Sequence, residues 1–451
     1  MFNKSPLVIT FIASLCPILG AIFNVWTYNI PALLIGLICL LGFRIIKYRS
    51  NYLTRYFVPT FIIVFAIHMV RGNGFAILSN GAYVLIFALV FTACFEANKG
   101  ITIASLLRGI TYLYKFYVLT LIAEFILVIL GFQSNLTSLL QSTLTPGYKD
   151  YNGADVLHLF GFTDISGLNG IVLGSQSATM LSLFSLIWFQ SLSKYKNARH
   201  GALWIYLSIF LCIITINFTG SILAMLYYVL YEINIKTKVS LLKLISIVIV
   251  ISTLAVLINY IGLFDRIFID DNLVINHMGS IDAVKASGLD IQAISGMSTR
   301  QYYFYIQALP IFNWLDQGLM NQLFGVSREL ILGETIYRTG DFGLGEILFT
   351  SGFIWLIVFV IILFRICLPA LKLYKVGDDV DNGRLWPLFC ANNALVSLLF
   401  LASLIHYPQA TGNAGLLTLF SLHLALTIYS HSRCRASANA IYTSDTCKLP
   451  A

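Results

Sequence analysis

The stretch GLGEILFTSGFIWLIVFVIILF, residues 343–364, decides the fold class of this chain. It carries one ionisable side chain, Glu346, in a run as long as the roughly 20 apolar residues that a helix needs to cross a bilayer. A helix also satisfies its own backbone hydrogen bonds in lipid, where water is absent. The stretch therefore predicts a membrane-spanning helix.

The whole chain of 451 residues shares this apolar character. Hydrophobic residues make up 58% and charged residues 11%, whereas an ordinary soluble domain has roughly 25% charged residues. A soluble fold of this size could not cover its surface with so few ionic groups. We therefore predict an all-α fold, a polytopic integral membrane protein with about 10–12 transmembrane helices. The expected spans lie near 7–25, 29–46, 56–70, 76–96, 113–131, 171–190, 201–218, 221–235, 241–264, 343–364, 386–405 and 413–430.

The basic residues predict the orientation of these spans. The chain has 28 Lys and Arg against 20 Asp and Glu, a formal net charge of +8. Most of the cations fall in alternate short loops, such as Lys194, Lys196 and Arg199, which is the positive-inside pattern. This pattern places both termini in the cytosol. The basic excess is thus a topological signal, and we expect no nucleic-acid partner.

Two long outer loops interrupt the compact pattern, and long loops in a compact protein are usually functional. The second loop is too rich in aromatic residues for a disordered connector. We interpret its part 302–312 as an amphipathic segment that lies on the membrane surface or folds back into a cavity, and we expect short amphipathic helices in the two long periplasmic loops. The predicted organisation is 1–131 with the first five helices, 132–170 as the first loop, 171–264 with helices six to nine, 265–342 as the large loop, 343–430 with the last three helices, and 431–451 as a cytosolic tail.

The large outer loop gathers groups that suit phosphate chemistry. Arg300, Arg328 and Arg338 are a candidate pyrophosphate clamp, because guanidinium groups make bidentate, permanently charged contacts with phosphate oxygens. The alternative is that they form surface salt bridges with acidic residues of the same loop. Asp341 and Glu346 are carboxylates that could act as a general base beside such a clamp.

Other ionisable residues fall within the predicted spans, where charges are costly and often functional. Glu124 and Glu346 are candidates for lining a polar cavity or pairing with an Arg. His68 and His423 are weaker candidates, because a neutral imidazole can simply hydrogen-bond a neighbouring helix. The eight cysteines form no C-x-x-C pair, no grouping has metal-ligand spacing, and no Walker A sequence appears. We expect no metal and no cofactor.

One set of segments resembles a known family. Arg300 opens the amphipathic stretch 302–312, which leads to Leu323-Phe324-Gly325-Val326, and Asp341-Phe342-Gly343 then runs on to Ser351-Gly352-Phe353-Ile354. These features, with the predicted architecture, resemble the bacterial O-antigen polymerase and ligase superfamily of membrane glycosyltransferases. Asp341 stands where ligases carry His, which favours a polymerase, and Glu346 stands where the family often has Glu or Gln.

The resemblance implies a polymerase of lipopolysaccharide biosynthesis in the bacterial inner membrane. It would join oligosaccharide repeat units carried on undecaprenyl pyrophosphate at the periplasmic face, without a metal. Arg300, with Arg328 or Arg338, would neutralise the leaving pyrophosphate, and Asp341, or alternatively Glu346, would act as base. Expected partners are the lipid-linked oligosaccharide, membrane lipid and a chain-length regulator protein. Further candidate substrate contacts are Lys149 and three aromatic residues, Tyr302, Tyr303 and Trp314. The aromatic rings would stack on sugars or pack against lipid.

Two alternatives stay open. An O-antigen ligase would transfer finished glycan to a lipid acceptor instead of extending it. A twelve-span transporter or flippase of lipid-linked oligosaccharides would usually show two related halves, and here the long loop 265–342 has no counterpart in the middle of the first half.

Overall fold

The computed structural model is almost entirely helical in the residues that it describes. These are 57–71, 82–97, 102–130, 175–192, 201–214, 227, 311, 313–326, 330–332, 335–337, 343–373, 385–404 and 419–434. The predicted spans near 7–25, 29–46 and 241–264 and the first loop 132–170 lie outside them. So do the span near 221–235, apart from residue 227, and most of the tail 431–451.

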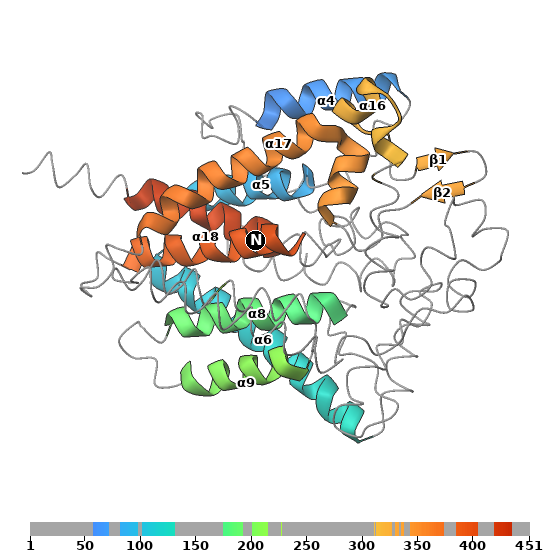
Figure 1. Cartoon of the computed structure of the whole chain (residues 1–451). Coiled ribbons are helices and arrows are strands. Elements are labelled where there is room, and N and C mark those ends of the chain that lie inside the picture. The colour runs from blue at the N-terminus through green and yellow to red at the C-terminus, as the bar shows by residue number, and fades with distance from the viewer. Residues whose placement is uncertain are drawn as a thin grey trace, which may run out of the picture.

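The helices follow the predicted spans in order. A further helix without a label in Figure 1, which we call the terminal helix, covers 419–434. The labelled helices are α4 (Val58–Val70), α5 (Ala82–Ala97), α6 (Ile103–Ile129), α8 (Ser175–Leu192), α9 (Gly201–Ile214), α16 (Leu319–Phe324), α17 (Gly343–Leu371) and α18 (Leu385–Ser403).

Among the described residues, three helices are long and apolar enough to cross a membrane. They are Ile103–Ile126 in α6, Ile347–Leu371 in α17 and Trp386–Ser403 in α18. Shorter apolar helices occupy Val58–Val70, Ala178–Leu192 and Gly201–Cys212. The described part is therefore compatible with a membrane protein.

One helix start differs from its prediction. Hydropathy places the start of the fifth span at residue 113, but α6 begins at Ile103. The side chains of Thr102 and Ser105 explain the earlier start, since Thr102 Oγ1 accepts a hydrogen bond from the Ser105 N–H at 3.2 Å and Ser105 Oγ accepts one from the Thr102 N–H at 3.2 Å. Such reciprocal bonds cap a helix N-terminus. Arg108, which precedes the predicted span 113–131, therefore lies on α6.

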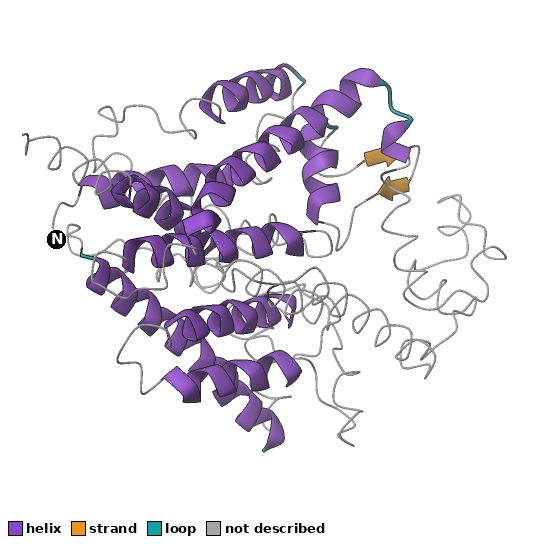
Figure 2. Cartoon of the chain, turned by 60° about the vertical axis from the view of Figure 1, so that its left-hand side comes forward, coloured by secondary structure: helices purple, strands orange, loops and turns teal. Residues whose placement is uncertain are grey.

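The long helices form a layered array. Figure 1 shows α17 beside α18 with α4 above α17, and α8 beside α9 at the other side of the array. A two-stranded antiparallel ribbon, β1 (Leu330–Leu332) with β2 (Thr335–Tyr337), lies at one end of the helices (Figure 1 and Figure 2). These strands were not predicted, because the sequence analysis expected short amphipathic helices in this loop.

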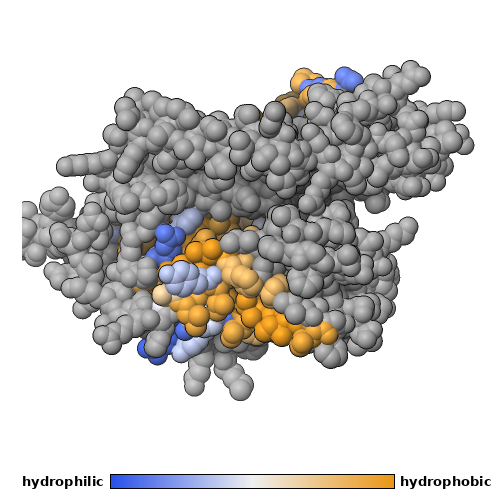
Figure 3. Space-filling view, turned by 60° about the horizontal axis from the view of Figure 1, so that its bottom comes forward, coloured by the Kyte–Doolittle hydropathy of each residue, from blue (hydrophilic) through white to orange (hydrophobic). Residues whose placement is uncertain are grey.

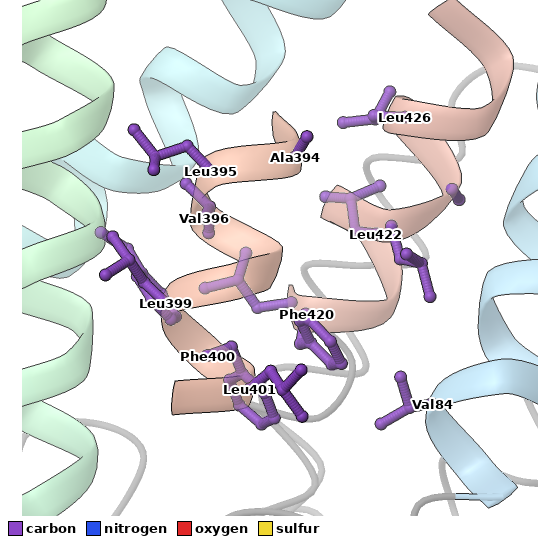
Figure 4. Close-up of a cluster of buried hydrophobic side chains, with 14 of the residues drawn as sticks. Val84, Ala394, Leu395, Val396, Leu399, Phe400, Leu401, Phe420, Leu422 and Leu426 are labelled. Carbon is purple, nitrogen blue, oxygen red and sulfur yellow. The ribbon is translucent and has the colours of Figure 1, made fainter. Parts of the chain in front are cut away.

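The core lies between α18 and the terminal helix. Figure 4 shows their apolar side chains facing one another, with Val84 of α5 close by. Phe400 and Phe420 stack with ring centroids 4.0 Å apart. Leu395, Leu399 and other apolar residues of both helices are fully buried.

The outer faces of several helices are apolar as well. Figure 3 shows a broad apolar surface on the side where α6 and α9 lie. Leu119 and Ile126 of α6 are about half exposed, as are Leu203 and Phe210 of α9. Large apolar patches on a protein surface mark contact with lipid or partners, so this face fits a lipid environment.

A buried polar network joins three helices inside this apolar array. The Tyr114 hydroxyl and the His423 ring share a hydrogen bond of 2.5 Å between Oη and Nε2. His423 Nδ1 lies 2.7 Å from Asn393 Oδ1, and Asn393 Nδ2 donates to the Phe389 carbonyl at 2.7 Å. The expectation that His423 hydrogen-bonds neighbouring helices is thus confirmed.

Replacing Tyr114 by Phe should lower the free energy of unfolding by about 1–2 kcal/mol, because a buried imidazole nitrogen loses its partner. Tyr112→Phe is the matched control, since this tyrosine lies on the same helix and is 63% exposed. Thermal unfolding of both variants in one detergent measures the difference. Equal stability of the two would mean that the network contributes nothing.

Candidate functional site

The candidate site lies where α4, α16 and the first part of α17 meet, which we call the α4–α16–α17 junction (Figure 1). Its centre is a break in α17. Gly352 has φ 77° and ψ 177°, far from helical values, so two helical pieces meet there. A positive φ costs little only at glycine, which has no Cβ.

A second glycine explains why the helix breaks at this point. Gly325 ends α16, again with φ 77°, and its main chain crosses that of α17. A Cβ on Gly352 would lie 2.5 Å from the Gly325 nitrogen, and one on Gly325 would lie 2.6 Å from the Ser351 nitrogen. The Val326 N–H donates to the Phe349 carbonyl at 2.9 Å. The segments 323–326 and 351–354, which carry the family resemblance, are therefore in main-chain contact.

Arg71 links α4 to this crossing. It follows the last residue of α4, and its Nη1 donates to the Gly325 carbonyl at 2.6 Å. Its Nη2 donates to Oδ1 of Asn321, in the middle of α16. The contacts of Arg71 lie about 250 positions along the chain, and no local pattern reveals them.

Three buried polar side chains at the junction have no hydrogen-bond partner within the described part of the chain. They are the His68 imidazole, the Trp314 indole N–H and the Ser351 hydroxyl. The Arg71 guanidinium and the Phe324 main chain provide the polar surroundings of His68. Buried polar groups in proteins are nearly always hydrogen-bonded, so this concentration suits a place that holds water or a polar ligand.

Trp314 is the one predicted site residue whose side chain the structure describes. It is fully buried, with its ring centroid 5.2 Å from that of Phe353. Phe349 completes the buried cluster, and Ile311 and Val326 pack against it. Trp314 thus stabilises the junction by packing against protein.

The described residues on either side of the segment 327–342 are hydrogen-bonded to helices. At one end Val326 is bonded to Phe349, and at the other the Leu344 N–H donates to the Leu404 carbonyl at 2.7 Å. This segment contains three of the predicted site residues. The β1–β2 ribbon lies within it, with Leu332 paired to Thr335.

The other predicted site residues are not described. Glu346 lies in the first turn of α17, with its side chain outside the described set. Residues Arg300, Tyr302, Tyr303, Arg328, Arg338, Asp341 and Lys149 lie wholly outside it. Over the described ranges, no three or more His, Cys, Asp or Glu side chains come together in a possible metal site.

Comparison with known proteins adds no assignment. No model of a known protein family matches the chain, and no curated protein sequence matches it.

Proposed function

We propose that this protein is a polytopic inner-membrane glycosyltransferase that polymerises oligosaccharide repeat units carried on undecaprenyl pyrophosphate. The observation that carries the proposal is the contact between 323–326 and 351–354. These are the segments by which the chain resembles the O-antigen polymerase superfamily. The two segments on which the resemblance rests are therefore in contact, and the segment 327–342 follows the first of them in the sequence.

The proposed reaction is one displacement at a sugar carbon. An acceptor hydroxyl attacks the anomeric carbon of the donor sugar, the new glycosidic bond forms, and the bond to the lipid pyrophosphate breaks. Asp341, or Glu346 in its place, takes the hydroxyl proton. Arg300, with Arg328 or Arg338, neutralises the charge that develops on the leaving pyrophosphate. The reaction needs neither a metal nor a nucleotide sugar.

The membrane setting of the proposal rests on the apolar helices and their exposed faces. Three helices have the length and hydropathy of a span, and the α17 face of Ile357, Ile361 and Phe364 is 41–53% exposed. We propose ten to twelve spans with both termini in the cytosol, as the positive-inside pattern indicates. The α4–α16–α17 junction then lies at the periplasmic side.

The decisive experiment is an assay with purified protein and a polyprenyl-pyrophosphate repeat unit, without nucleotide sugar or divalent cation. A ladder of longer lipid-linked glycans is the expected result. Transfer only to an added lipid A acceptor would identify a ligase. Translocation across proteoliposomes without a new glycosidic bond would identify a flippase and overturn the proposal.

Asp341→Asn should lower turnover about 100-fold, the usual scale for losing acid–base catalysis. The amide keeps the shape of the side chain but cannot take a proton from the acceptor hydroxyl. Asp316→Asn is the control, because Asp316 is an exposed carboxylate without a role in the proposed reaction. Initial rates of glycan extension measure both variants. Wild-type turnover in Asp341→Asn, with loss in Glu346→Gln, would assign the base to Glu346.

A further inference from the structure

The short helix α16 has little apolar packing of its own. None of its residues is buried, and Leu319 and Met320 are 67% and 61% exposed. A six-residue helix is also too short to be stable in isolation. Contacts with neighbouring helices must therefore hold it in place, and Arg71, directly after α4, provides two side-chain hydrogen bonds.

The hydrogen bonds around Arg71 fix the orientation of each partner. Asn321 Nδ2 donates to the Gln317 carbonyl at 3.1 Å, which leaves Oδ1 as the acceptor that faces Arg71. The Gly325 N–H donates to the Asn321 carbonyl at 2.8 Å, while its own carbonyl accepts from Arg71. One planar guanidinium thus joins the middle and the end of α16. A lysine ammonium lacks this fork geometry.

The long helices do not depend on this link. At the other end of α4, Phe57 and Phe61 pack against Trp355 of α17 with ring centroids 5.7 and 6.0 Å apart. Loss of the Arg71 bonds should therefore loosen α16 and leave the pairing of α4 with α17 intact. A loosened α16 would then hold Gly325 and Val326 less firmly.

We infer that Arg71 is a positioning residue: by bonding Gly325 and Asn321 it fixes α16, the helix that precedes the proposed reactive residues Arg328, Arg338 and Asp341 in the sequence. This inference rests on the proposed function. It assigns Arg71 no contact with the substrate. Since a displacement of about 1 Å in a reacting group can cost about 100-fold in rate, the link governs turnover.

The test compares Arg71→Ala and Arg71→Lys in the full-length protein. Both should speed amide hydrogen exchange in 319–326 by about tenfold or more, the change that a lost charge-assisted hydrogen bond implies. Exchange in α18 should stay unchanged. Turnover should fall about 100-fold with little change in the KM for the lipid-linked donor. Asn321→Ala combined with Arg71→Ala should be no worse than Arg71→Ala alone.

Arg433→Ala is the matched control, because Arg433 also bonds a side chain, Tyr429, at 3.0 Å, but far from the junction. It should alter neither readout. A raised KM in Arg71→Ala that Arg71→Lys restores would mean direct electrostatic contact with the substrate and would overturn the positioning role. Unchanged hydrogen exchange in 319–326 of Arg71→Ala would also overturn the positioning role. The same holds for faster exchange in this variant with normal turnover. Wild-type protein without transfer activity would refute both the proposed function and the positioning role, while exchange would still decide whether Arg71 holds α16.

Discussion

Replacement of Gly352 by alanine should destabilise the protein by about 4 kcal/mol or more and abolish glycan extension. Two costs add at this residue. Its φ of 77° is unfavourable for any residue with a Cβ, and the new methyl would overlap the Leu323 carbonyl and approach the Gly325 nitrogen to 2.5 Å. Main-chain atoms held from both sides cannot move aside. Thermal unfolding in detergent and the yield of folded protein measure the loss.

Gly318→Ala separates the two costs. Gly318 has a φ of 84° and a ψ of 161°, but nothing lies within 4 Å of the Cβ position, so only the cost of this backbone conformation, about 1–3 kcal/mol, remains. Gly325→Ala should resemble Gly352→Ala, because its Cβ would overlap the Thr350 carbonyl. If Gly352→Ala and Gly318→Ala proved equally stable, the main chains would not cross as described.

The order and type of the helices follow from hydropathy, whereas their ends and breaks depend on particular contacts. The apolar run 343–364 predicts a helix, and α17 covers it. The break at Gly352 is set by the crossing with Gly325, which the sequence places 27 positions away. Glycine within an apolar run is common in membrane helices, so the residue alone does not indicate a break.

The β1–β2 ribbon had a local signal. Leu330-Ile331-Leu332 and Thr335-Ile336-Tyr337 are short apolar or β-branched triplets separated by Gly333-Glu334. A glycine first in a two-residue connection is typical of a hairpin turn. The charges and aromatic residues of this loop dominated its interpretation, so these two short triplets were not recognised as strands.

The candidate site was predictable only in part. Resemblance to a family singled out the segments around Gly325 and Gly352, but their contact is a tertiary feature that spacing cannot supply. Arg71 and His68 join them from the end of α4. His68 was expected only as a weaker candidate within a span, and Arg71 was not expected at the site. Trp314 was expected to stack on sugar or pack against lipid, and its burial against Phe353 reflects a loop that folds back onto α17.

Arg300→Ala should abolish long polysaccharide chains while the amount of protein in the membrane stays normal. In the proposed reaction one further negative charge develops on the departing pyrophosphate, and removing one preorganised donor at such a position costs about 100–1,000-fold in rate. The chain-length ladder on a gel reports this loss directly, because slow extension leaves single repeat units on the lipid. Arg300→Lys should recover only part of the rate, since an ammonium does not bind two phosphate oxygens in parallel.

The control for Arg300→Ala is Arg365→Ala. Arg365 is an exposed residue of α17 that the charge pattern assigns to the cytosolic side. It should keep the full ladder. An unchanged ladder in Arg300→Ala would remove the guanidinium from the reaction and with it the main chemical argument for a pyrophosphate leaving group. Cysteine accessibility at residue 300 gives an independent check, because the reaction requires this loop to face the periplasm. Labelling from the cytosolic side alone would contradict the proposed orientation even if the variant were inactive.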